Sequence, residues 1–178
     1  MTMAHWIHKI ARLWRHRWAE GQLSRTLPPA LLDQLTHAVA ASELRHTGQI
    51  RLCIEAGLPA SYVWRSANAR ERALTMFSKL RVWDTEHNNG VLIYLLLADH
   101  AIEIVADRSL ARQVAQPVWN ALTNALGDAL RAGRTTEGLM QALAAVSALL
   151  EQHFPSPSTL SHQAHPNELP DTPFVARH

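Results

Sequence analysis

The chain has 178 residues, 47% of them apolar, which is enough for one domain with a sizeable core. Its 17 Lys+Arg and 15 Asp+Glu leave a net charge of only +2, which excludes a strong general attraction to nucleic acid. The single cysteine, Cys53, excludes an intrachain disulfide and suits a reducing compartment.

The N-terminal segment, residues 5–20, is expected to form an amphipathic helix, followed by a short linker that reaches residue 27. Three tryptophans lie on its apolar side, and the opposite side is mainly basic. Two interpretations remain open, because such a helix either packs on the core with its basic side outward or lies on an anionic membrane surface. The residues expected to contact a membrane or a partner are Trp6, Lys9, Ile10, Arg12, Trp14 and Trp18.

The next elements follow from proline, alternation and capping signals. Pro28-Pro29 predicts the start of a second helix, which reaches about Arg45. Residues Ile50–Glu55 alternate with the period of two that predicts a strand. Asn68 and Glu71 form a capping-box pattern, so another helix is expected to begin there.

The segment Val91–Ala98 is apolar on both faces and predicts a buried strand. Asp99-His100 should reverse the chain into a second strand, Ala101–Ala106, as an antiparallel hairpin. Helices are expected from residue 107 to residue 154. Because helices must cover both faces of the buried strand, the predicted class is α/β, as a three-layer α/β sandwich around a small mixed sheet of three or four strands.

After residue 154 the composition changes. Five of the nine prolines fall in residues 155–178, and large apolar residues become rare. We therefore expect a Pro-rich flexible tail over 155–178, with Asn167–Asp171 as a candidate docking peptide for a protein partner. This divides the chain into a Trp-rich helix and linker over 1–27, an α/β domain over 28–154, and the tail.

A polar turn precedes the buried strand and offers oxygen ligands. Asp84 and Asn88 lie in this turn, and the hairpin should bring Asp107 back toward it. Carboxylate and amide oxygens are the ligands that calcium and magnesium prefer, so these three residues are a candidate divalent-cation site. The alternative is that the same side chains only stabilise the turn by bonding its backbone.

Several of these motifs resemble the TPM domain family in order and spacing. They are Glu43-x-x-x-Thr47-Gly48-Gln49-Ile50, the residues Ala73, Phe77 and Leu80 ahead of Asn88-Asn89-Gly90-Val91, the segment Asp99-x-x-x-Glu103-Ile104, and Gly133 with Gly138-Leu139. The family includes thylakoid-lumen proteins linked to photosystem repair and an auxiliary protein of acetylcholine receptors. The resemblance covers residues 28–154.

The resemblance implies an α/β sandwich, divalent-cation binding, usually of calcium, and an acid-phosphatase activity. Many members are secreted or lumenal and tethered to a membrane. This chain departs from them, because Asp107-Arg108-Ser109 stands where many members have a glycine-rich turn and Gln49 where an acidic residue is common. Its basic N-terminus also lacks the apolar core of a signal peptide.

Together these features favour a non-catalytic interaction domain. We expect it in the cytoplasm, peripheral at the inner face of the membrane or bound to a membrane-protein partner. The alternative function is a divalent-cation-dependent acid phosphatase. Nucleic acid is not expected as a partner, because the basic residues are concentrated in one helix without a basic patch on the core.

Overall fold

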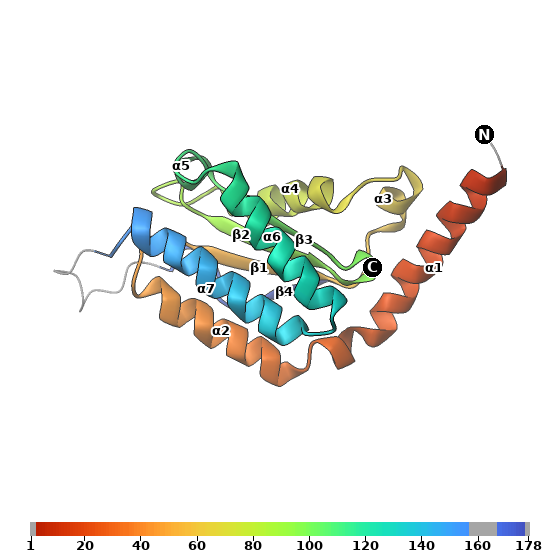
Figure 1. Ribbon diagram of the computed structural model, residues 1–178, viewed down its shortest axis with the longest axis horizontal. Coiled ribbons are helices and arrows are strands. Elements are labelled where there is room, and N and C mark those ends of the chain that lie inside the picture. Colours follow the sequence, from red (N-terminus) through yellow and green to blue (C-terminus); the bar gives the residue numbers. More distant parts are fainter. Residues whose placement is uncertain (1–2, 157–166, 177–178) are drawn as a thin grey trace.

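The computed structural model describes residues 3–156 and 167–176. Figure 1 shows the elements in chain order. They are α1 (Met3–Thr26), α2 (Pro29–Glu43), β1 (Ile50–Glu55), α3 (Ala60–Trp64), α4 (Ala69–Lys79), β2 (Val91–Leu96), the 3-10 turn η1 (Leu97–Asp99), β3 (Ala101–Ala106), α5 (Arg108–Ala111), α6 (Gln116–Arg131), α7 (Thr135–His153) and β4 (Phe174–Ala176).

The sheet has the strand order β3-β2-β1-β4. β1 pairs in parallel with β2 and with β4, whereas β2 and β3 form the predicted antiparallel hairpin. All six residues of β2 are buried, which explains why its sequence is apolar on both faces. The predicted mixed sheet is therefore confirmed.

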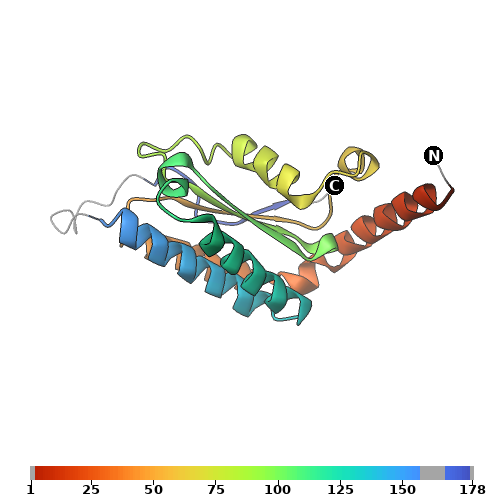
Figure 2. The same ribbon diagram turned by 45° about the horizontal axis from the view of Figure 1, so that its top comes forward.

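Helices cover both faces of this sheet, as the buried central strand requires. α2, α6 and α7 lie on one face, and α3 and α4 lie on the other (Figures 1 and 2). The larger core lies under the first group and includes Leu35, Val39 and Val146, all fully buried. The smaller core lies under the second group and includes Met76 and Tyr94. The predicted three-layer α/β sandwich is confirmed.

Helix α1 extends farther than the expected 5–20 and carries its C-terminal end into the larger core. Leu23 and Leu27 are buried there. The N-terminal part of the helix projects away from the sheet and the other helices (Figure 2). α1 is thus held to the body near its C-terminal end and along one side only.

Two local features differ from the expected ones. The strand predicted over Val91–Ala98 ends at Leu96, because η1 forms the turn and His100 takes a left-handed conformation with φ of 46°. The tail expected to be flexible over 155–178 contributes β4, which pairs with Cys53, Ile54 and Glu55. Three residues are too short a run to show strand periodicity, so β4 could not be recognised from its sequence.

The candidate docking peptide Asn167–Asp171 instead packs on its own domain. The side-chain oxygen Oε1 of Gln49 accepts hydrogen bonds from the backbone N–H groups of Glu168 and Leu169, each at 3.0 Å. Leu169 is buried in the smaller core. The Arg51 guanidinium also donates to two carbonyl oxygens of this segment, so it forms part of the fold.

Candidate functional site

Helix α1 docks on the body through polar contacts. The Arg12 guanidinium donates to Asp99 Oδ2 at 3.0 Å and to the carbonyl oxygen of Ala67 at 2.9 Å. Arg15 also bonds the Asp99 carboxylate, and His16 Nε2 lies 3.2 Å from Asp99 Oδ1. The other ring nitrogen of His16 accepts a hydrogen bond from Leu58 N at 2.9 Å. A single carboxylate in the η1 turn therefore holds three basic side chains of the helix.

The basic side chains of α1 stabilise the negative charge of Asp99 at this contact. Burial of Asp99 acts to raise the pKa of its carboxyl, but hydrogen bonds from His16 and Arg12 outweigh burial and hold that pKa well below its usual range. The helix backbone also comes very close to Gly57, where a Cβ would lie 2.7 Å from the carbonyl oxygen of His16. A side chain at position 57 would push α1 away from Asp99.

Arg12 and His16 therefore face the body, whereas the side chains of Arg15 and Arg17 are 57% and 74% exposed. An apolar group of α1 also faces away from the body. The exposed fractions are 40% for Ile10, 73% for Trp14 and 74% for Trp18. Their spacing of four residues places them along one side of the helix. We call these three residues the tryptophan face.

The other residues predicted for this contact behave differently. Arg12 is engaged by Asp99 and Ala67 and is separated from the tryptophan face. Trp6 and Lys9 lie in α1, but their side chains lie outside the described part of the structure. The role of all six residues in binding a membrane or a partner stays a prediction.

The three predicted cation ligands are held by arginines or by the backbone. Asp84 forms an exposed ion pair with Arg81. Asn88 has a left-handed backbone with φ of 51°, and its Oδ1 accepts from Arg108 Nε at 3.1 Å and Nη2 at 2.8 Å. The fold thus brings Asn88 close to the residue that follows Asp107, whereas Asp84 is bound to a different partner.

Asp107 has one oxygen occupied and one free among the described residues. Its Oδ1 accepts from Arg108 N at 2.6 Å and caps the short helix α5. Its Oδ2 is buried without a hydrogen-bond partner in the described part of the chain. The described residues contain no group of three or more His, Cys, Asp or Glu side chains placed to hold a metal ion. A cation bound by Asp107 would therefore depend on amide or backbone oxygens for its other ligands. The other two candidates, Asp84 and Asn88, are bonded by Arg81 and Arg108.

A buried polar cluster under α4 was not predicted. Arg72 donates to Glu55 through Nε at 2.8 Å and Nη2 at 2.6 Å, and the Tyr94 hydroxyl donates to the same carboxylate at 2.7 Å. Burial, and the adjacent Glu55 carboxylate, raise the pKa of Tyr94 above its usual range. Burial likewise raises the pKa of the Cys53 thiol, which makes it a poor nucleophile. The cluster has the geometry of a structural ion pair.

The described helices include none long and apolar enough to cross a bilayer.

Comparison with known proteins identifies the relatives of this fold. The solved NMR structure of the BA42 protein from the psychrophilic bacterium Bizionia argentinensis is similar, with a TM-score of 0.70 and 23% sequence identity. The match covers 83% of this chain and 93% of that chain, and at this identity it shows a shared fold. The curated proteins contain no match to the chain. The family model of the TPM domain matches residues 22–149. The chain therefore belongs to the TPM domain family.

Proposed function

We propose that the protein is a non-catalytic interaction domain that binds an anionic membrane surface through the tryptophan face of α1. The observation that carries this proposal is the exposure of Trp14 and Trp18 on a helix that is anchored by its other side. Tryptophan sits favourably at the boundary between headgroups and acyl chains, where its ring is half in an apolar phase.

The charge of α1 supports an anionic lipid surface as the binding partner. The helix carries five Lys+Arg and a single Glu, and the side chains of Arg15 and Arg17 are 57% and 74% exposed. Each basic residue close to an anionic surface contributes about 1 kcal/mol to binding, and the contribution falls with salt. On this proposal the protein acts in the cytoplasm, at the inner face of the membrane, where anionic lipids are abundant. A membrane-protein partner bound by the same face is the other outcome that the following test separates.

Replacing Trp14 and Trp18 together with glutamine is expected to reduce partitioning onto anionic vesicles by about tenfold or more, since burial of tryptophan in the interface is worth roughly 1–3 kcal/mol per ring. Co-sedimentation with vesicles of mixed neutral and anionic lipid measures the loss. The matched control is Trp83→Gln, which removes a 47% exposed tryptophan from the loop after α4. Equal partitioning of the double variant and the wild type would rule out the lipid surface.

A second candidate function, divalent-cation binding with phosphatase activity, has one observation in its favour. The unpartnered Oδ2 of Asp107 is a buried carboxylate oxygen of the type that calcium or magnesium binds. Arg108 competes for the neighbouring amide oxygen of Asn88 and places a positive charge there.

If a cation does bind at Asp107, removing the competing guanidinium should strengthen its binding. Calcium at millimolar concentration is then expected to raise the melting temperature of Arg108→Gln by about 3 °C or more, and that of the wild type by less. Asp107→Asn should abolish the rise, and Arg112→Gln, which removes a nearby exposed arginine, should leave it as in the wild type. No calcium or magnesium response in either the wild type or Arg108→Gln would remove this candidate.

A further inference from the structure

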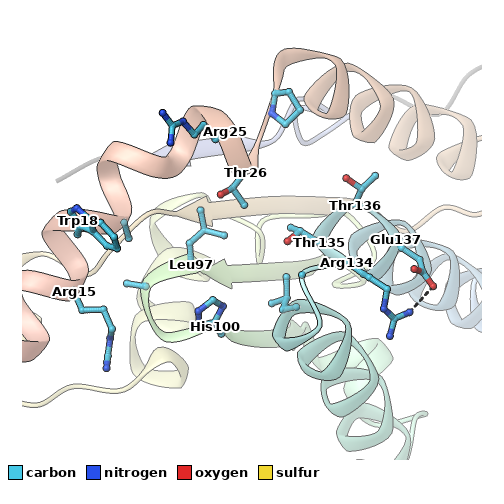
Figure 3. A pocket seen from close by; sticks show the side chains of 15 residues that line it. Arg15, Trp18, Arg25, Thr26, Leu97, His100, Arg134, Thr135, Thr136 and Glu137 are labelled. Atoms are coloured by element: carbon cyan, nitrogen blue, oxygen red, sulfur yellow. Dashed lines mark hydrogen bonds and ion pairs between the residues drawn. The ribbon is translucent and has the colours of Figure 1, made fainter.

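A cavity of about 830 Å³ lies beside α1, between its C-terminal half, the η1 turn and the turn that joins α6 to α7 (Figure 3). Its size falls in the range of small-molecule sites, roughly 300–1,000 Å³. It is much larger than a bare inorganic ion requires. The cavity therefore has room for an organic molecule.

The α6–α7 turn sets one wall of this cavity. Gly133, with φ of +74°, ends α6 in the left-handed conformation, and Arg134 N then donates to the carbonyl oxygen of Ala129 at 2.8 Å. This turn starts α7 at Thr135, and Arg134 gives the helix no side-chain cap. The helix start contributes partial positive charge to the wall, and Figure 3 shows Thr135 directed toward the centre of the cavity.

Three arginines from separate positions surround the cavity, namely Arg15, Arg25 and Arg134. Arg134 is balanced by an ion pair with Glu137 at 3.0 Å. Arg15 shares Asp99 with Arg12, so one positive charge is left over at that contact.

Arg25 forms no hydrogen bond or ion pair with any residue in the described part of the chain, which adds a second positive charge. The surplus of two positive charges would balance one dianion.

The remaining wall is mainly apolar, with His100 and Thr26 among its polar residues. Leu97 lies at the centre of the view in Figure 3, Leu130 comes from the end of α6, and Trp18 closes the side next to α1. A ligand that fits this lining has a compact, doubly charged anionic end and an apolar body. We propose that the cavity binds a small amphiphilic dianion, with Arg25, whose charge is not balanced, as the main charged contact and Arg134, which the dianion would share with Glu137, as the second. This site is separate from lipid binding by the tryptophan face, although Trp18 borders both.

The test uses the full chain and benzylphosphonate, which carries a dianionic end on an aromatic body. Isothermal titration calorimetry at mildly alkaline pH should show saturable binding, and the double variant Arg25→Gln/Arg134→Gln should weaken it by about tenfold or more. Both arginines are exposed, so the core is untouched, and an unchanged melting temperature checks this. Arg131→Gln, which removes an exposed arginine of α6 that does not line the cavity, is the matched control.

Vesicles distinguish a lipid from a soluble ligand. Phosphatidic acid presents a similar dianionic end at a membrane, so its vesicles are compared with phosphatidylserine vesicles of equal charge. A preference for phosphatidic acid that the double variant loses identifies a lipid, and saturable benzylphosphonate binding without such a preference identifies a soluble molecule. Absence of saturable benzylphosphonate binding, or equal affinity in the wild type and the double variant, would overturn the proposal even if the tryptophan face binds vesicles.

Discussion

Arg72→Met is expected to lower the free energy of unfolding by about 3–5 kcal/mol, because it leaves the Glu55 carboxylate buried without its cation. The Glu55 side chain is fully buried, and that of Arg72 is only 7% exposed. Arg72 supplies two of the hydrogen bonds to this carboxylate, and Tyr94 supplies a third. Neutral donors such as the Tyr94 hydroxyl do not compensate a buried charge, so in the variant Glu55 must take up a proton on folding or admit water. Urea denaturation measures the loss.

Two comparisons make this prediction specific. Glu55→Leu/Arg72→Met replaces both charged partners with apolar side chains and should recover much of the lost stability. Removing both partners of a buried ion pair costs less than leaving one charged partner buried alone. Arg65→Gln removes an exposed arginine that also stacks on Tyr62, and it should change stability little. A loss of similar size in Arg65→Gln, or a double variant no more stable than Arg72→Met, would contradict a role for the buried charge.

The layers of this fold were predictable because they follow from hydrophobic pattern. Val91–Leu96 is apolar at every position, which requires cover on both faces, and Asn68 marks the helix that provides part of that cover. Glu55 was placed in a strand, but its partner lies 17 residues away on a helix. Only the packing of α4 on the sheet turns this strand-end carboxylate into half of a buried pair, so the sequence could not show it.

The orientation of α1 could not be predicted from the sequence for a related reason. A helix with tryptophans on one side and arginines on the other is expected to bury its tryptophans when it packs on a core. Here Asp99 reverses that preference, because a turn between two strands presents a carboxylate at the helix. The same holds for the predicted cation ligands. Arg81 and Arg108 could be read from the sequence, but their contacts with Asp84 and Asn88 could not.

Glu43→Gln is expected to make the protein more stable at pH 8 by roughly 2–3 kcal/mol and to change stability little near pH 4.5. Burial at the end of α2, together with the carboxylates of Asp171 and Glu168, raises the pKa of Glu43 to about 7, although Ile50 N donates to its Oε1 at 2.8 Å and acts in the opposite direction. Between the ordinary value of 4.5 and about 7 the folded chain holds a proton that the unfolded chain has released. Stability therefore falls as pH rises through this window in the wild type.

A glutamine keeps the acceptor for Ile50 N and never ionises, so the fall should vanish in the variant. His46 contributes the opposite slope in the same range, because burial lowers its pKa to about 4 and folding is opposed where the unfolded imidazole is protonated. In the wild type the two slopes partly cancel, and Glu43→Gln should uncover a rise in stability from pH 4.5 to pH 6.5. Denaturation curves across this range measure it, with Glu86→Gln as a control for the loss of one exposed negative charge. If the difference in the free energy of unfolding between Glu43→Gln and the wild type is the same at every pH, then Glu43 ionises alike in the folded and the unfolded chain. Burial beside Asp171 and Glu168 would then not hold its proton.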